Sequence, residues 1–252
     1  MGAVSVPFTF AHPAAVLPLR RYLWLPGLVV GSVVPDVAYY LPVPGGADAG
    51  HSVAGLVGID LLLGIVLLVI GQLVVAPLLA LLSEGWRARV SPVDPVARFP
   101  VRRAIVALIV GAATHLVWDA VTHTDGAAVR SWPLLRESVV GPHRLYNVIG
   151  YVSSLGGLLL LGAVVLRWYR RAPREHGAHW RALSRKSRSW VLGGVAAAMA
   201  AGAGIALTDP VSRVSAYDWV RLLLIGGVQG AGIALALYVL CWHLARHLSS
   251  SC

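Results

Sequence analysis

Long apolar stretches separated by short polar segments run through most of the chain. The stretches long enough to cross a bilayer cover about 53–82, 104–122, 148–166, 190–207 and 220–240. A helix needs about 20 predominantly apolar residues to span the hydrocarbon core, because each residue adds about 1.5 Å along its axis. The pattern therefore predicts five transmembrane helices joined by polar loops.

An apolar stretch before these five is interrupted by residues that a membrane span avoids. Within residues 14–34 the interrupting residues are Pro18, Arg20, Arg21 and Pro26. They disfavour one uninterrupted span. Two limbs of about 10 residues, roughly 15 Å each, would return His12 and Asp36 to the same side of the membrane, whereas one kinked crossing would separate them. We expect an all-α, polytopic transmembrane helical bundle with about five full spans plus a broken or re-entrant N-terminal helical pair.

Composition supports a membrane protein and narrows the classes of partner. Of the 252 residues, 57% are hydrophobic and 13% are charged, and the mean hydropathy is +0.72, far from the balance of a soluble domain. The net charge of +10 does not indicate nucleic acid as a partner, because no basic segment carries the interleaved aromatic residues of a known reader. Cys241 and Cys252 form neither a disulfide framework nor a CxxC metal motif.

The basic residues are unevenly distributed among the predicted loops. Loop 83–103 contains five arginines and loop 167–189 contains seven arginines and one lysine. Basic residues are sparse in the other three loops. There are none in loop 41–56, three arginines in loop 123–147 and one arginine in loop 209–219. By the positive-inside rule the basic loops and the C-terminus are cytoplasmic, and the three sparse loops are extracytoplasmic.

The same pattern predicts three parts of the chain. Residues 1–171 form a membrane domain, 172–189 a basic cytoplasmic loop, and 190–252 two C-terminal transmembrane helices with a short tail. The last two spans are rich in Ala and Gly, and such small residues suit close packing between membrane helices.

One polar row stands out inside the apolar pattern. The segment Gly111–Gly126, GAATHLVWDAVTHTDG, holds His115, Asp119 and His123 at successive spacings of four. Four residues of α-helix turn about 40° past a full circle and climb about 6 Å, so the three side chains share one face. A single intramembrane histidine is more often a hydrogen-bonded core residue, but three ionisable groups in lipid are costly without an ion or a partner. The row is a candidate site for a divalent metal.

Two further ionisable residues, Asp36 and His51, emerge on the same predicted side of the membrane as His123. They should meet the 115–123 row at the outer membrane–water boundary, together with His12 if the first segment is re-entrant. Neutral imidazole and carboxylate groups are ligands of Zn²⁺ and similar ions, and a catalytic site leaves one position open for water. Such a centre suits metal-assisted hydrolysis.

Several neighbouring residues have two interpretations that the sequence leaves open. Asp60, near the beginning of the first long span, is either a carboxylate that supports the ligands or an interfacial cap. Arg130 and Arg144 either attract a phosphate or another anion, or contact lipid headgroups. The residues that flank the row either orient ligands or pack against neighbours: Thr114, Trp118 and Thr122.

The chain also resembles known membrane proteins in a set of short motifs. These are Pro7-Phe8-Thr9-Phe10-Ala11-His12-Pro13, Pro35-Asp36, His51-Ser52 and Thr114-His115…Asp119…Thr122-His123. They resemble an uncharacterised family of bacterial polytopic membrane proteins that carries a domain of unknown function. That family is similar to bacterial inner-membrane metal-dependent hydrolases and, more distantly, to zinc-dependent phospholipases C. The resemblance covers roughly Val6 to Arg171.

The resemblance implies a metal centre in the bacterial inner membrane. Its implied ligands are His12, Asp36, His51, His115 and Asp119, with His123 as a further candidate. Zinc is the expected ion, with manganese as the alternative. The leading hypothesis is a metal-dependent hydrolase acting at the outer leaflet on a lipid or another phosphate- or acyl-bearing substrate. The candidates for its general base are His123, Asp125 and Asp60.

Other functional classes remain open at the level of sequence. A non-enzymatic helical bundle could use the same residues to hold a structural metal or to relay an ion or proton. A third hypothesis is a scaffold whose polar residues only join helices. The expected partners are membrane lipids, nucleic acid is not among them, and the sequence is silent on oligomeric state.

Overall fold

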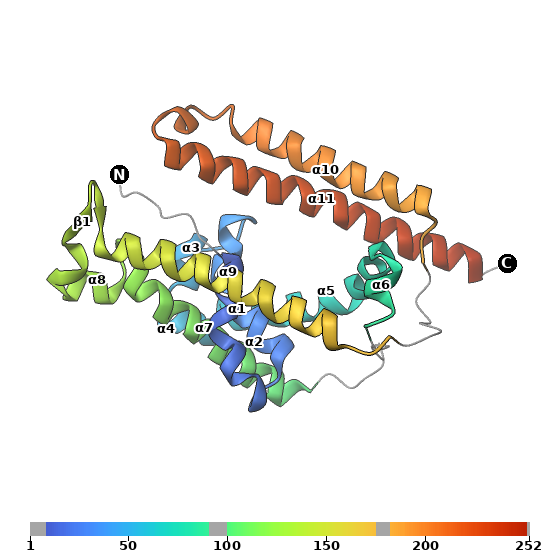
Figure 1. Ribbon diagram of the computed structural model, residues 1–252, viewed down its shortest axis with the longest axis horizontal. Helices are drawn as coiled ribbons and strands as arrows, with labels where there is room; N and C mark the ends of the chain where they lie inside the picture. Colours follow the sequence, from blue (N-terminus) through green and yellow to red (C-terminus); the bar gives the residue numbers. More distant parts are fainter. Residues whose placement is uncertain (1–8, 91–99, 175–181, 251–252) are drawn as a thin grey trace. The chain divides into compact units, whose positions relative to one another are not determined.

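The computed structural model describes residues 9–90, 100–174 and 182–250, and they are predominantly helical (Figure 1). Among them, five segments are long and apolar enough to cross a membrane. The long helices in these segments are α5 (Ile59–Leu81), α7 (Val101–Thr122), α9 (Leu145–Arg171), α10 (Arg185–Ala206) and α11 (Ala216–Ser250). The prediction of an all-α bundle with five spans is confirmed. Parts of the sequence patterns lie outside the described residues, namely Pro7, Phe8, Arg98, Arg181 and Cys252.

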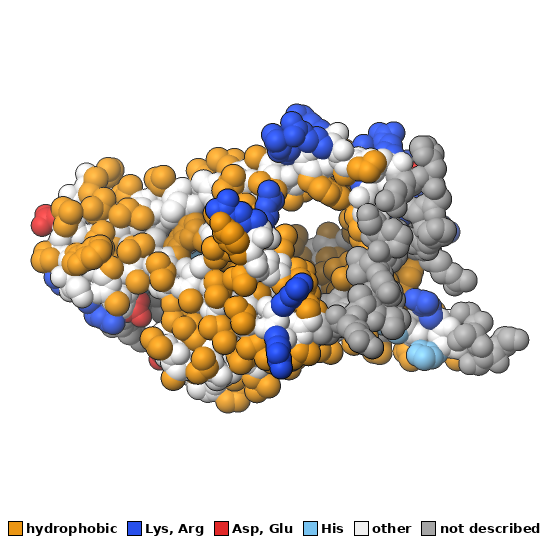
Figure 2. All heavy atoms as spheres, turned by 90° about the horizontal axis from the view of Figure 1, so that it is seen from below, with side chains coloured by type: hydrophobic (Ala, Val, Ile, Leu, Met, Phe, Trp, Pro, Cys, Tyr) orange, Lys and Arg blue, Asp and Glu red, His pale blue; other side chains and the backbone are white. Residues whose placement is uncertain are grey.

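The surface agrees with a membrane environment. Apolar side chains cover much of the face in Figure 2, and large hydrophobic residues on the long helices remain strongly exposed, such as Leu159 at 65% and Ile205 at 72%. A soluble protein rarely leaves so many large apolar side chains in water. Lipid is the solvent that suits this surface.

The remaining elements are short. In the first part of the chain they are η1 (Thr9–Ala11), α1 (Pro13–Val16), η2 (Leu17–Arg21), α2 (Leu25–Gly31), η3 (Val34–Tyr39), α3 (Gly46–Gly50) and α4 (Val53–Val57). The later ones are α6 (Glu84–Arg87), α8 (Ala127–Ser131), η4 (Pro133–Arg136), β1 (Ser138–Val140), β2 (His143–Arg144) and η5 (Pro210–Arg213). Strands β1 and β2 pair antiparallel, and Gly141, with φ of 53°, forms their turn. The segment 123–147, which the sequence predicted as a loop, is therefore locally structured.

The N-terminal segment is a broken helical pair, as the prolines predict. Pro18 lies in the first turn of η2 and Pro26 in the first turn of α2, where a missing backbone N–H leaves no hydrogen bond unmade. The two limbs fold back on each other, so that their far ends meet. At these ends the Thr9 hydroxyl donates a hydrogen bond to Asp36 at 2.5 Å. This contact is incompatible with one kinked crossing, which would separate the two ends.

The chain forms two compact units. The first contains Met1–Leu68 and Arg98–Arg171, and the second contains Val69–Ala97 and Ala172–Cys252. Helix α5 begins in the first unit and ends in the second. The three-part division predicted from the sequence stays a prediction.

In the first unit, helices α2 and α7 pack at very close range. A side chain on Gly31 would collide with the backbone of Leu108, and one on Gly111 would collide with the carbonyl of Leu28. Leu28, Leu108 and Ala107 are fully buried around this contact. The close approach matters for the site, because it brings the end of α2 against the middle of α7.

In the second unit, α10 and α11 lie side by side (Figure 1), with glycines at the contact. Gly202 faces the carbonyl of Gly226, and Gly230 faces the carbonyl of Ala198, without room for a side chain. The small residues of these spans therefore support close packing, as expected. Close backbone approach replaces bulky side-chain packing here.

Helix α11 also contacts the end of α5 that belongs to this unit. Pro77 lacks a backbone N–H, so the carbonyl of Leu73, four residues earlier, loses its helical partner. The His243 Nε2 atom lies 2.9 Å from this carbonyl oxygen and donates to it. The Tyr238 hydroxyl donates to the Pro77 carbonyl at 2.9 Å. The His243 side chain thus satisfies the carbonyl that Pro77 leaves free within a membrane helix.

Candidate metal centre

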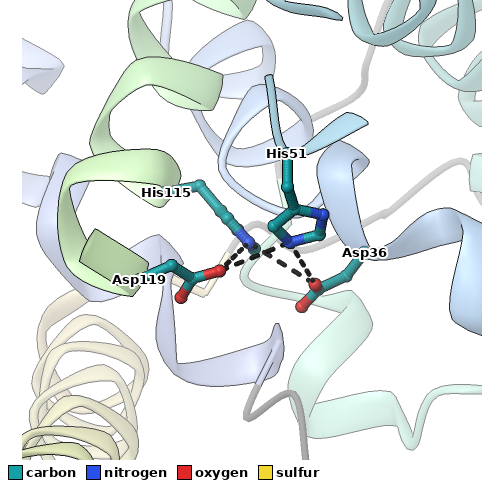
Figure 3. Close-up of side chains that lie close together, drawn as sticks. All are labelled: Asp36, His51, His115 and Asp119. Atoms are coloured by element: carbon teal, nitrogen blue, oxygen red, sulfur yellow. Dashed lines mark ion pairs between the residues drawn. The ribbon is translucent and has the colours of Figure 1, made fainter. Parts of the chain in front are cut away.

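Four side chains from three separate segments of the first unit converge on one point (Figure 3). His115 and Asp119 lie one turn apart on α7, Asp36 lies in η3, and His51 lies between α3 and α4. Each offers one ligand atom, and these four atoms all lie within 4.8 Å of one another. Two imidazole nitrogens and two carboxylate oxygens therefore form one compact donor set.

Local structure explains how each segment reaches this point. Helix periodicity places His115 and Asp119 on one face of α7. Ser52 caps α4 by accepting a hydrogen bond from the Gly55 N–H at 2.9 Å, which fixes the chain directly after His51. A side chain on Gly50 would collide with the carbonyl of Pro35, so only glycine allows this close approach. The turn carrying His51 thus packs against the segment that carries Asp36.

The four nitrogen–oxygen distances in the set are close to those expected around a single ion. His51 Nε2 lies 3.3 Å from Asp36 Oδ1 and 3.3 Å from Asp119 Oδ2. His115 Nε2 lies 3.4 Å and 3.0 Å from the same two oxygens. Tetrahedral zinc with bonds of about 2.0–2.1 Å separates its ligand atoms by about 3.3–3.4 Å. Each nitrogen lies at a similar distance from two oxygens, a spacing that is compatible with one cation between them.

Burial makes this convergence costly unless positive charge lies between the carboxylates, supplied by a bound cation or by protonated histidines. Asp36 and His115 are 0% exposed and Asp119 is 6% exposed. Asp36 Oδ1, His115 Nε2 and Asp119 Oδ2 have no hydrogen-bond partner among the described residues. Buried polar atoms are nearly always paired, and an isolated buried charge is more costly still. These donors fit a divalent cation held between them.

The outer sides of the donor groups are held by hydrogen bonds. The Thr9 hydroxyl donates to Asp36 Oδ2 at 2.5 Å. His115 Nδ1 lies 2.8 Å from the Ser32 carbonyl oxygen, and it must donate because a carbonyl only accepts. The neutral ring of His115 then presents the lone pair of Nε2 to the cluster, the form in which imidazole binds metal. Ser32 contributes its main-chain carbonyl. Every residue has such a group, so the sequence could not indicate this contact.

Charge and burial act in opposite directions on Asp36. Burial raises the pKa of its carboxyl group, but the nearby imidazoles of His115 and His51 and the hydrogen bond from Thr9 outweigh burial, so this pKa lies well below its ordinary value. The ionised form of this carboxyl group is therefore favoured. Tyr39, whose ring centre lies 5.9 Å from that of His51, has a raised pKa because it is buried and lies near Asp36. Its hydroxyl stays neutral beside the site, a role that no sequence motif indicated.

The other predicted ligand, His12, lies beside the four-residue set. Its Nε2 is 3.2 Å from Asp119 Oδ1, the carboxylate oxygen outside the donor set. Its ring stacks on that of His115 with centres 3.9 Å apart and an interplanar angle of 16°. The structure thus brings His12 to the site through contacts with two of the donor residues.

The three predicted general-base candidates lie at different places. His123 Nδ1 is 3.4 Å from Asp119 Oδ2, and its side chain is 14% exposed. Asp60 is 1% exposed, and its carboxylate lies close to the backbone of Gly50, beside His51. Asp125 is exposed in the turn after α7 and does not belong to the converging set.

The flanking polar residues mostly serve their own helix. Thr114 donates to the carbonyl of Gly111 at 2.7 Å, and Thr122 donates to that of Trp118 at 2.9 Å. The ring centre of Trp118 lies 5.2 Å from that of His12. Arg130 and Arg144 are exposed on the segment between α7 and α9. None of these five supplies a donor atom to the convergent set.

A comparison with protein-family models places this architecture in a known group. The family described as Domain of unknown function (DUF4184) matches residues 6–240. The chain belongs to the DUF4184 family. No curated protein and no solved structure matches it.

Membership of the DUF4184 family bears out the resemblance to an uncharacterised family. The match extends beyond the Val6–Arg171 stretch on which the resemblance rested, and includes α10 and most of α11. All four convergent residues of this DUF4184 protein lie within the matched range. The family description names no activity, so the function must be argued from the site.

Proposed function

We propose that this membrane protein carries a metal-dependent, hydrolase-like centre. One observation carries the proposal: two imidazole nitrogens and two carboxylate oxygens from distant segments lie within 4.8 Å of one another in a largely buried site. The same residue types supply the metal ligands of many hydrolytic zinc sites.

The donor set favours a particular class of ion. His51 and His115 would supply nitrogen, and Asp36 and Asp119 would supply oxygen. Zinc accepts this mixture in tetrahedral geometry, and manganese, which favours oxygen-rich and larger coordination shells, is the alternative. A divalent ion bound here would act as a Lewis acid that polarises a carbonyl or phosphoryl oxygen.

Residues next to the donor set would handle protons and admit the substrate. His123 is our first choice for the general base, because its Nδ1 lies 3.4 Å from a donor oxygen and its side chain is 14% exposed. Asp60 is a second choice, since its buried carboxylate has no hydrogen-bond partner among the described residues. Asp125, exposed in the turn that follows, would act only after a movement of that turn. The side chain of His51 is 19% exposed, which supports access to the site from outside.

We assign the substrate to lipids or other phosphate- or acyl-bearing molecules at the extracytoplasmic leaflet of the bacterial inner membrane. Two features support this assignment. The helices of the first unit have strongly exposed apolar surfaces that suit lipid. The segment after His123 also belongs to an arginine-poor loop, which the positive-inside rule assigns to the outside.

A structural metal in a non-enzymatic bundle is the second candidate. It is favoured by the number of donors, because four protein ligands complete a tetrahedron, as in most structural zinc sites. Such an ion would hold three segments together: η3, α7 and the turn that precedes α4. It would catalyse no reaction. The two candidates differ in whether the bound ion exchanges and supports hydrolysis.

Elemental mass spectrometry on detergent-purified protein tests the centre. The wild type should contain near-stoichiometric metal, and a His115→Ala, Asp119→Ala double variant should contain none. His143→Ala is the matched control, because His143 is exposed and lies outside the donor set. Absence of metal from the wild type, even after incubation with Zn²⁺ and Mn²⁺, would refute the proposal.

Hydrolysis of phospholipids and phosphoesters by the metal-loaded wild type then separates the two candidates. Activity lost in the double variant and kept in His143→Ala supports the enzyme. A bound ion that resists exchange, in a protein inactive on all of these substrates, supports the structural role.

A further inference from the structure

In each carboxylate of the donor set, one oxygen faces the two imidazole nitrogens and the other contacts a residue outside the set. Asp36 Oδ1 and Asp119 Oδ2 belong to the contacts with His51 and His115. The outer oxygen of Asp36 accepts a hydrogen bond from Thr9, and the outer oxygen of Asp119 lies 3.2 Å from His12 Nε2. Thr9 and His12 are three residues apart in the sequence. One short segment thus contacts both carboxylates.

The local backbone explains this double contact. Residues Thr9–Ala11 form a 3₁₀ turn, closed by the His12 N–H bonding to the Thr9 carbonyl at 3.3 Å. Residues i and i+3 of such a turn lie on the same side. Phe10 points away and is 61% exposed. Ala11 is fully buried against α9, where a side chain on Gly157 would meet the Ala11 carbonyl oxygen at 3.2 Å. The turn is therefore anchored with both polar side chains facing the site.

The chemistry of the His12 contact assigns its proton. An ionised carboxylate can only accept a hydrogen bond, so His12 must carry its proton on Nε2 to bond Asp119 Oδ1. Nε2, which carries the proton, then has no lone pair for a metal, and neither nitrogen of His12 belongs to the convergent set of donor atoms. His12 is 3% exposed and stacks on the ring of His115, which restricts the orientation of that ligand as well.

We infer that the turn Thr9–His12 is a clamp that orients both carboxylate ligands, and that His12 is a positioning residue and not a metal ligand. This inference rests on the metal centre proposed above. It replaces the role that the sequence resemblance implied for His12. Groups that hydrogen-bond to metal ligands typically change metal affinity by about 10- to 100-fold when removed, while the ion still binds.

Two matched pairs of variants separate positioning from ligation. Thr9→Ser keeps the hydroxyl donor and Thr9→Val removes it with little change in volume. His12→Gln keeps an N–H donor near the position of Nε2, and His12→Leu removes it. His115→Ala, which deletes a ligand, is the reference for loss of the centre.

The readout is zinc affinity of the full-length purified protein, measured by competition with a chromophoric chelator, together with metal content. Thr9→Val and His12→Leu should bind the same amount of zinc as the wild type with about 10- to 100-fold weaker affinity. Thr9→Ser and His12→Gln should recover most of the affinity. His115→Ala should bind no zinc at the site. Cooperative thermal unfolding of each variant confirms that it is folded.

The outcomes distinguish the clamp from the centre on which it rests. Wild-type affinity in both Thr9→Val and His12→Leu would overturn the clamp and leave the centre intact. Loss of zinc in both His12→Gln and His12→Leu, as complete as in His115→Ala, would show that His12 is a ligand. A wild type that binds no zinc or manganese would overturn the centre and the clamp together.

Discussion

His115 Nδ1 donates a hydrogen bond to the main-chain carbonyl of Ser32 at 2.8 Å. The bond joins the middle of α7 to the residue that follows α2, two segments 83 positions apart in the sequence. It also determines that Nε2 of His115 faces Asp119 and Asp36. The packing of two helices thereby sets the orientation of one candidate ligand.

This relationship predicts different effects for two substitutions of His115. His115→Asn retains an N–H near the position of Nδ1 and should preserve the bond to Ser32 while losing the metal. His115→Ala should lose both, and the unpaired buried carbonyl should lower the free energy of unfolding by about 1–3 kcal/mol relative to His115→Asn. Thermal unfolding in chelator, combined with metal analysis, measures both effects. Equal stability of the two metal-free variants would contradict the assigned bond.

The close contact between α2 and α7 should tolerate no side chain at Gly111. Gly111→Ala would drive a methyl group into the carbonyl of Leu28, and overpacking of this kind costs about 1–3 kcal/mol. Gly156→Ala on α9 is the matched control, because its added methyl group would meet nothing within 4 Å. We expect a lower unfolding temperature for Gly111→Ala than for the wild type. The unfolding temperature of Gly156→Ala should stay close to that of the wild type. Similar unfolding temperatures for both variants would count against the packing described.

Removal of the proposed ion should destabilise the protein. Without it, the buried carboxylates Asp36 and Asp119 keep only the neighbouring imidazoles as partners. A ligand present at 100 times its Kd stabilises the folded state by about 2.7 kcal/mol, so chelation should lower the unfolding temperature by roughly 5–10 °C. Added Zn²⁺ should restore it. The unfolding temperature of the His115→Ala, Asp119→Ala variant should change with neither chelator nor Zn²⁺. If it changed as much as that of the wild type, the stabilising ion would bind at another site.

The contact of His243 with Leu73 should depend on Pro77. His243→Leu leaves the Leu73 carbonyl without its donor, and such interhelical bonds contribute about 0.6–1.7 kcal/mol in membranes. In a Pro77→Ala background, the restored N–H of residue 77 can bond this carbonyl, so His243→Leu should cost less. A double-mutant cycle of unfolding free energies gives this difference. An identical cost in both backgrounds would show that the proline is not the cause.

The orientation predicted from the arginine distribution can be tested in intact cells. Single cysteines at Ser138 and Lys186, both exposed, are introduced after Cys241 and Cys252 are replaced by serine. A membrane-impermeant maleimide should label Ser138→Cys in intact cells and Lys186→Cys only after permeabilisation. The reverse pattern would place the candidate site on the cytoplasmic side and move the proposed substrate to the other leaflet.

Much of the architecture followed from local sequence patterns. Five apolar runs predicted the five long helices, because lipid requires every backbone group of a span to bond within its own helix. Pro18 and Pro26 predicted the break in the N-terminal pair, because proline cannot continue a helix from the preceding residues. The spacing of His115 and Asp119 placed both on one face of α7, because helix geometry alone decides that relation.

Contacts between distant segments were not accessible in this way. The sequence indicated that Asp36 and His51 lie on one side of the membrane, but only the packing of Gly50 and Gly111 brings their atoms to within 4.8 Å of those on α7. Thr9 and the Ser32 carbonyl were missed because their partners lie 27 and 83 residues away. The sequence determined the helices and the residue types of the site, since these depend on local geometry and solvent. The tertiary structure decided which atom faces which, since hydrogen-bond and metal geometry depend on ångström-scale packing.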